Sequence, residues 1–191
     1  MLQNIIPSQT RLKVLELFFH NPNENYYLRR VVREVEKEVN AVKRELDILE
    51  KEKVLTREPR LNKVFYFLNK NYKYYDEFLR IFSKSDNLAQ LIYQNLPKLG
   101  KIKFIALSTK FSKRQEIKED EVYFMLVGQI VVPEITQIVS EVEKTFGRDI
   151  NYTVMAEDEF AFRKRNNDPF VWRFLRQPKV MLVGSEDEFL K

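Results

Sequence analysis

The stretch Tyr27–Asn69 reads YLRRVVREVEKEVNAVKRELDILEKEKVLTREPRLNKVFYFLN and holds the most specific structural pattern in the chain. Its first part predicts a short helix over Leu28–Val35, because apolar residues recur there at helical spacing. A second helix is predicted over Val39–Glu52. One side of that helix is apolar, with Val42, Leu46 and Leu49. The sequence therefore predicts two amphipathic helices separated by a tight break.

A hairpin is expected to follow these helices. Two strands are predicted near Val54–Glu58 and Val64–Leu68, because their β-branched and aromatic content favours strand. Pro59 to Lys63 are expected to form the turn between them. Two short helices followed by a polar, basic hairpin describe a winged helix-turn-helix. In that module the second helix enters the DNA major groove.

The predicted outer side of this module carries the candidate contacts to double-stranded DNA. Asn40, Lys43 and Arg44 lie near the start of the second helix, where such helices contact bases. Asp47 is positioned to orient Lys43 or Arg44 through a helical pair. The candidates for phosphate or minor-groove contacts are Arg29, Arg30 and Arg33 on the first helix and Arg57, Arg60 and Lys63 in the hairpin. The alternative is a charged surface that binds protein rather than DNA.

Helices are also predicted on either side of this module. Ser8 is a plausible N-cap for a first helix that stops at His20–Asn23, where proline cannot continue it. An aromatic helix over Tyr72–Phe82 is expected either to form a dimer surface or to cover a seam between domains. The polar segment Ser83–Asp86 is the expected hinge. The predicted domains are therefore residues 1–84 and 85–191.

The sequence after Gly100 alternates between strands and helices, which predicts an α/β domain with one mixed sheet and an α+β class for the whole chain. The expected strands are Ile102–Leu107, Val122–Val127, Asn151–Met155 and Lys179–Val183, with the second ending at Gly128. The expected helices are Asn87–Leu96, Glu134–Phe146, Glu157–Arg165 and one around Phe170–Arg176. A charged loop, Lys110–Asp120, separates the first two strands.

Composition narrows the class of protein. The 191 residues have a net charge of +5, and residues 1–70 hold 14 Lys/Arg against 10 Asp/Glu, so the basic excess lies where a polyanion would bind. No apolar run is long enough for a transmembrane helix, which predicts no membrane association. The chain contains no cysteine, which fits a cytoplasmic protein.

The pattern resembles a known family. The segments SQTRLKVLELFF, NYYLRRVVREV, NAVKRELDILEKEKVL and KVFYFLN are similar to those of ArsR-like winged helix-turn-helix regulators. The C-terminal segments FMLVG, KTFGRDINYTVM, EDEF and DPFVWRFLRQPKVMLVGSEDEF resemble a small nucleotidyltransferase-like domain. Together they resemble prokaryotic regulators in which the two domains are fused. The resemblance implies a transcriptional regulator that binds DNA as a homodimer, because palindromic operators offer paired half-sites.

The chain departs from this family at two turns. In such regulators a glycine usually sits before the second helix of the pair and another just after it. Here Glu36 and Lys53 occupy those places. A left-handed turn residue other than glycine costs of order 1 kcal/mol, so the resemblance predicts two strained turns.

The chain also departs from the family at its catalytic positions. Active nucleotidyltransferases carry Gly-Ser after the first strand and two aspartates at i and i+2 on the second, which hold magnesium. Ser108-Thr109 and Glu121-Val122-Tyr123 occupy those positions, and a tyrosine does not replace a metal-binding carboxylate at neutral pH. The strand Asn151–Met155 has no third carboxylate, and a shifted pair, Glu119 and Glu121, lies off register.

The sequence thus predicts a pseudo-enzyme domain with no catalytic residue, metal site or cofactor, fused to a DNA reader. The second domain is expected to bind a protein or to sense an effector. Ser108, Thr109 and Lys113 are candidates to bind a nucleotide phosphate without turnover, against the alternative of a solvated loop. The runner-up function is an active nucleotidyltransferase that modifies a protein or small molecule, with the winged domain as its docking module.

Overall fold

The computed structural model describes residues 2–191, which form an α+β structure with two sheets. The chain divides into two compact units. The first holds the chain up to Phe82 together with Ser112–Arg114, and the second holds Ser83–Phe111 and Gln115–Lys191. The main boundary therefore lies close to the expected hinge. The two units are described separately.

The first unit contains helices and one small sheet. Its elements are η1 (Leu2–Asn4), α1 (Gln9–His20), β1 (Asn25–Tyr27), α2 (Leu28–Val35), α3 (Val39–Lys51), β2 (Leu55–Arg60), β3 (Lys63–Leu68) and α4 (Tyr75–Ser83). The predicted helices α1, α2 and α3 are confirmed almost to the residue. Ser8 caps α1 as expected, because its Oγ accepts a hydrogen bond from the Arg11 N–H at 3.1 Å.

The core of the first unit lies where α1, α2 and α3 meet. Phe18, Val31, Val42 and Leu46 are all fully buried there. Each comes from the apolar side of its helix, so the helical spacing in the sequence selects the buried face directly. Burying side chains of this size contributes on the order of 2 kcal/mol each, which orients the three helices firmly.

The small sheet differs from the prediction in two ways. Its antiparallel order is β1-β3-β2, and the three-residue strand β1 was not expected. The predicted turn Pro59–Lys63 is also wrong, because Pro59 pairs with Val64 and Arg60 pairs with Lys63. Only Leu61 and Asn62 connect the strands. Proline is tolerated in β2 because this strand lies at the edge of the sheet, where one side of its backbone needs no partner.

Helix α4 begins later than predicted and uses its aromatic side chains inside the first unit. Tyr75, Leu79 and Phe82 belong to the same core as α1. Phe19 stacks on Phe82 with ring centroids 5.0 Å apart. These side chains are therefore not available as the dimer surface that the sequence suggested. Tyr74, just before α4, remains exposed.

The second unit is an α/β structure around one mixed sheet. Its elements are α5 (Asn87–Asn95), η2 (Leu96–Lys98), β4 (Gly100–Ser108), α6 (Thr109–Ser112), β5 (Phe124–Ile130), α7 (Val132–Phe146), β6 (Tyr152–Met155), α8 (Glu157–Arg165), α9 (Pro169–Arg176), β7 (Lys179–Val183) and α10 (Glu186–Leu190). The strand order is β6-β5-β4-β7, in which only β5 and β6 run parallel.

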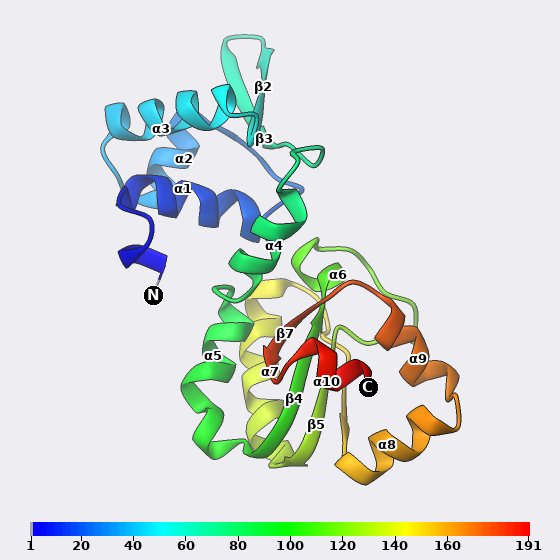
Figure 1. Cartoon of the computed structure of the whole chain (residues 1–191). Coiled ribbons are helices and arrows are strands. Elements are labelled where there is room, and N and C mark those ends of the chain that lie inside the picture. The colour runs from blue at the N-terminus through cyan, green and yellow to red at the C-terminus, as the bar shows by residue number, and fades with distance from the viewer. Residues whose placement is uncertain (1) are drawn as a thin grey trace. The chain divides into compact units, whose positions relative to one another are not determined.

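Helices cover both faces of this sheet. Figure 1 shows α5 and α7 against one face and α8 and α9 on the other. The two apolar clusters agree with this layering. One joins α5 and α7 to the sheet, and the other joins α8, α9 and α10 to it. Strands buried on both faces explain the nearly continuous apolar run at Phe124–Val127.

Two details of this unit correct the sequence prediction. Gly128 does not end its strand, since β5 continues to Ile130. A Cβ at Gly128 would lie 2.3 Å from the Lys101 carbonyl oxygen, so glycine is required by the close approach of β4. The final helix α10 was not predicted, and Ser185 caps its start, since the Ser185 Oγ accepts a hydrogen bond from the Glu188 N–H.

None of the helices in residues 2–191 combines the length and apolar character needed to cross a membrane.

Candidate nucleic-acid interface

A buried carboxylate fixes α3 against α1. Glu45 is 8% exposed, although it lies in the middle of a charged helix. It accepts hydrogen bonds from Ser8 Oγ at 2.6 Å and from Arg11 Nε at 2.7 Å. Because Ser8 also caps α1, the start of α1 and the inner side of α3 share one network. This network sets the rotation of α3 about its axis and so decides which side chains point outward.

The turn between α2 and α3 has the conformation that the family resemblance implied. Glu36 adopts φ 52° and ψ 48°, which is left-handed. Lys53, after α3, has φ 64°. The Lys13 ammonium donates to the Val35 carbonyl oxygen at 3.1 Å and satisfies an otherwise free group at the end of α2. The tight break is thus formed without glycine, at the cost of some backbone strain.

Glu38 caps the N-terminus of α3. Its carboxylate accepts hydrogen bonds from the N–H groups of Asn40 at 2.8 Å and Ala41 at 3.0 Å. These two bonds hold the pKa of the Glu38 carboxyl below its usual value, and the charge of Arg44 acts in the same direction. The same bonds occupy N–H groups that a phosphate would otherwise use. Any anion at this helix must therefore be bound by side chains.

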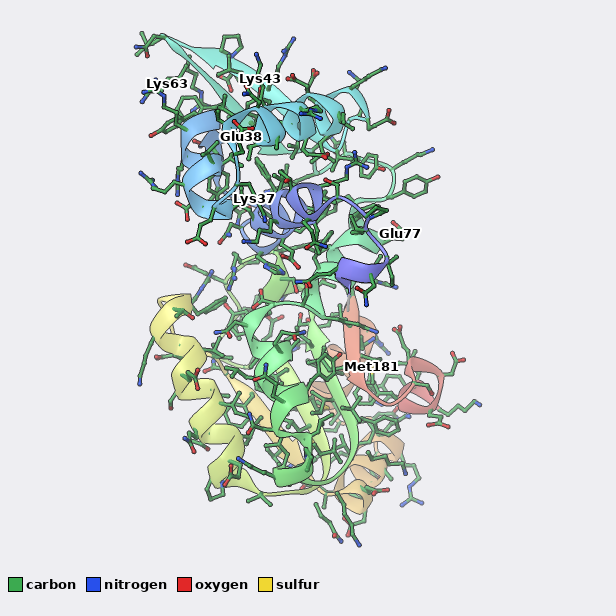
Figure 2. The ribbon with its side chains drawn as sticks, turned by 90° about the vertical axis from the view of Figure 1, so that its left-hand side faces the viewer. Lys37, Glu38, Lys43, Lys63, Glu77 and Met181 are labelled. Atoms are coloured by element: carbon green, nitrogen blue, oxygen red, sulfur yellow. The ribbon has the colours of Figure 1, made fainter. Side chains whose placement is uncertain are left out.

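The outward side of α3 carries exposed polar side chains, as predicted. Asn40, Lys43, Arg44 and Asp47 are all exposed. Within residues 2–191, neither Lys43 nor Arg44 has a carboxylate oxygen within ion-pair distance. The expected pair with Asp47 is therefore absent, and that prediction was wrong. Figure 2 labels Lys43 on this side of α3 and Lys63 on the hairpin, both at the surface of the first unit.

The three arginines predicted on α2 differ in their surroundings, and Arg33 is exposed and lies 3.8 Å from a Glu34 carboxylate oxygen. Arg29 is exposed, and the described structure assigns it no ion pair. Arg30 lies 4.6 Å above the ring of Tyr26 and donates to the Asn25 carbonyl oxygen at 3.2 Å. Burial raises the pKa of Tyr26 to about 12, although the charge of Arg30 opposes that shift. Arg30 therefore supports the link between β1 and α2 and is the weaker candidate for a phosphate contact.

The hairpin cations also have partners within the protein. Arg57 lies 3.7 Å from a Glu50 carboxylate oxygen, so it ties β2 to α3. Arg60 makes two hydrogen bonds of 3.0 Å to Glu58, and its guanidinium lies over the ring of Phe67. The Lys63 ammonium lies 4.3 Å from the centroid of the Tyr27 ring. Exposed pairs of this kind contribute little to the free energy of folding, so the phosphates of a polyanion could replace them with little loss of stability.

Three residues that shape this surface were not predicted from the sequence. Glu45 and Glu38 were not singled out, and neither was Lys13. Glu38 was missed because the usual N-cap residues are serine, threonine, aspartate and asparagine, and glutamate is not one of them. Glu45 carries no such local signal, because its partners lie 34 and 37 residues away in the chain.

In the second unit, the hydroxyls predicted as phosphate contacts are enclosed. Ser108 is fully buried at the end of β4, where its Oγ donates to Gln177 at 3.2 Å and accepts from the Lys110 N–H. Thr109 donates to the Pro178 carbonyl oxygen at 3.2 Å. Their burial contradicts the solvated-loop alternative, and phosphate binding at these residues stays a prediction. Lys113, the third candidate, pairs with Asp76 in the first unit.

Glu121, which stands at the predicted acidic position, is likewise engaged in hydrogen bonds within the protein. Glu121 accepts two hydrogen bonds from the Lys110 ammonium, at 2.7 and 2.8 Å. These bonds and the Lys118 N–H hold the pKa of Glu121 below its usual value. Tyr123 is 2% exposed, donates its hydroxyl to the Gln115 carbonyl oxygen at 2.9 Å and packs edge-on against Phe111. It is a core residue that precedes β5.

Two further results bear on function. Among residues 2–191, no group of three or more His, Cys, Asp or Glu side chains is placed to hold a metal ion. Comparison of the chain with protein-family models, curated proteins and solved structures found no match in any of the three. Its function must therefore be inferred from its own side chains and their contacts.

Proposed function

We propose that the protein is a DNA-binding transcriptional regulator whose first unit is a winged helix-turn-helix. In this proposal α3 enters the major groove of duplex DNA and the β2–β3 hairpin is the wing. The observation that carries it is the division of α3 into two sides. Glu45 is hydrogen-bonded to α1 on one side, while Lys43 and Arg44 are exposed on the other and have no carboxylate partner in the described part of the chain.

The residues on the outward side of α3 support this function because they are exposed and are of the types that bind the edges of bases. Arginine and lysine are the usual partners of guanine edges, and asparagine is that of adenine. Asn40, Lys43 and Arg44 lie in the N-terminal half of the helix, the half that contacts bases in helix-turn-helix proteins. Arg29 at the start of α2 is placed as a phosphate contact, where it would fix orientation rather than sequence.

The second unit is proposed to be a non-catalytic nucleotidyltransferase-like domain that binds a protein or an effector. This is supported by the internal hydrogen bonds of Ser108 and Glu121 and by the burial of Tyr123. The protein is further proposed to act in the cytoplasm as a homodimer, since a two-fold assembly matches palindromic sites and multiplies the affinity of one half-site. Its dimer surface is left unassigned because the aromatic side of α4 is buried.

The test is a mobility-shift titration of the full chain against a pool of random duplexes, followed by sequencing of the bound fraction. Arg44→Ala is expected to weaken binding to the selected duplex by about tenfold, the effect of about 1.4 kcal/mol. Arg80→Ala is the matched control, because Arg80 is an exposed arginine of the same unit and its loss changes the charge equally. Equal affinities for the two variants would contradict the proposal.

A further inference from the structure

One residue at the tip of the β2–β3 hairpin, Leu61, is unusual both in its exposure and in its backbone conformation. Leu61 is fully exposed, with a relative exposure of 107%, the highest among the exposed large apolar side chains of the described chain. It also has φ 53°, in the left-handed region that a leucine rarely adopts. Its neighbours in the hairpin are Arg60 and Lys63, which pair with each other across the strands.

Neither feature helps the hairpin to fold. A left-handed residue in a two-residue turn is usually glycine, asparagine or aspartate, which adopt it at little cost. An exposed leucine gains nothing from burial in the free protein. Strained, non-glycine positions that persist in a fold are frequently functional. Leu61 therefore has the character of a side chain whose partner is another molecule.

We propose that Leu61 inserts as an apolar wedge into the DNA minor groove beside the major groove that α3 occupies. This inference rests on the proposed function and adds a specific, non-electrostatic contact to it. Proteins that enter the minor groove commonly insert leucine or a similar side chain between base steps and kink the duplex. The cations Arg60 and Lys63 on either side of the turn would lie against the phosphates that border the groove.

The tip of the hairpin extends beyond the three-stranded part of the sheet. Thr56–Glu58 pair with Phe65–Phe67 of β3, which also pair with β1, so this part of β2 lies within the sheet. Only Pro59 and Arg60 carry β2 further, over roughly 7 Å at about 3.3 Å for each residue, and they hold Leu61 clear of the core. Figure 1 shows the hairpin extending from the first unit beyond α3.

The charges around the tip favour DNA over an apolar protein surface as the occupant. Arg60, Lys63 and Arg57 outnumber Glu58 on the hairpin. Burying this many cations against an apolar partner would be costly, whereas phosphates neutralise them. Insertion would also favour flexible pyrimidine–purine steps at the contacted position, because these unstack most easily.

The test uses Leu61→Asn in the full chain, measured in two ways. Asparagine suits the left-handed turn, so the unfolding midpoint in urea should stay equal or rise. Affinity for the selected duplex should fall about tenfold, and the bend angle measured by energy transfer between duplex ends should decrease. Leu61→Met keeps an apolar side chain and should retain the bend. Ile81→Gln, which removes an exposed apolar residue from α4, should change neither affinity nor bend.

The outcomes separate this inference from the function on which it rests. Duplex binding that depends on Arg44 but is unchanged in affinity and bend by Leu61→Asn overturns the wedge and leaves the proposed function intact. Absence of duplex binding by the unmodified chain overturns both. If Leu61→Asn instead changes the sedimentation of the DNA-free protein, the leucine contacts a second copy and the wedge is overturned.

Discussion

The outward side of α3 and the loop that leads from β4 to β5 contain similar polar residues in opposite situations. On α3, Lys43 and Arg44 are exposed, and no carboxylate of the described residues lies within ion-pair distance of them. In the second unit, Lys110 is paired with Glu121, and the Ser108 hydroxyl is buried and hydrogen-bonded. Polar groups that are already satisfied have little left to offer a ligand. The comparison indicates binding at the first surface and structural support at the second.

The prediction with the largest expected effect concerns a substitution that places an acidic residue in the second unit. Tyr123→Asp would recreate the missing carboxylate of the nucleotidyltransferase pattern, but Tyr123 is a core side chain. Burying an unpaired carboxylate and losing an aromatic ring should destabilise the second unit by about 4 kcal/mol or more. Urea denaturation followed by circular dichroism measures this. A stable variant that hydrolyses nucleotide with magnesium would reverse our view of the domain. Tyr123→Phe, which loses only one hydrogen bond, should cost about 1 kcal/mol.

A second test removes the carboxylate that orients α3. Glu45→Ala leaves Ser8 and Arg11 without their partner and should reduce the free energy of unfolding by about 2 kcal/mol. This is less than for a fully buried pair, because the Arg11 side chain is 38% exposed. Asp47→Ala, an exposed carboxylate on the same helix, should stay within about 0.5 kcal/mol. Equal losses for the two variants, in a urea titration, would show that Glu45 does not hold α3.

The left-handed turns allow a smaller and stabilising test. Lys53→Gly and Glu36→Gly relieve backbone strain at φ 64° and 52° and should each raise stability by about 0.5 kcal/mol. Lys51→Gly, two residues earlier at the C-terminal end of α3, should instead lower it, by at most about 1 kcal/mol. Thermal unfolding of the three variants gives the comparison directly. A loss of stability in both turn variants would mean that these positions are not strained.

The smallest expected effect is a pH dependence at Glu121. Its pKa is lowered in the folded protein by Lys110, so the carboxylate stabilises the fold above the unfolded pKa of about 4.5 and this contribution is lost as the pH falls through the lowered value. Glu121→Gln should therefore lose less stability than the unmodified chain on acidification below pH of about 4.5, with a difference under about 1 kcal/mol. Parallel acid-dependence curves would show that the Lys110 pair contributes nothing.

Much of the fold follows from local sequence, and the exceptions have identifiable causes. Helical spacing predicted α1, α2 and α3, and Ser8 marked the start of α1. The strand β1 was missed because three residues carry too little pattern and are fixed only by pairing with β3. The turn was predicted too long because Pro59 reads as a strand breaker, whereas an edge strand accepts it.

The candidate site was less accessible to prediction than the fold. Exposure of Lys43 and Arg44 follows from helical periodicity, so these two residues could be identified from the sequence. The contact of Lys63 with Tyr27 depends on how β1 pairs with β3, which no local pattern reveals, and the contact of Arg30 with Tyr26 depends on the unpredicted strand β1. The exposed turn leucine was likewise hidden by the error in the length of the turn.

The measurement that tests the central claim most directly is the affinity for selected duplex DNA of two double variants with equal net charge. Lys43→Ala/Arg44→Ala removes two exposed cations from the outward side of α3, while Arg80→Ala/Lys84→Ala removes two exposed cations elsewhere. We predict a loss of about one hundredfold for the first variant, from about 2.8 kcal/mol, and a loss of less than about threefold for the second. Similar losses in both variants would contradict the assignment of α3 as the DNA-reading helix.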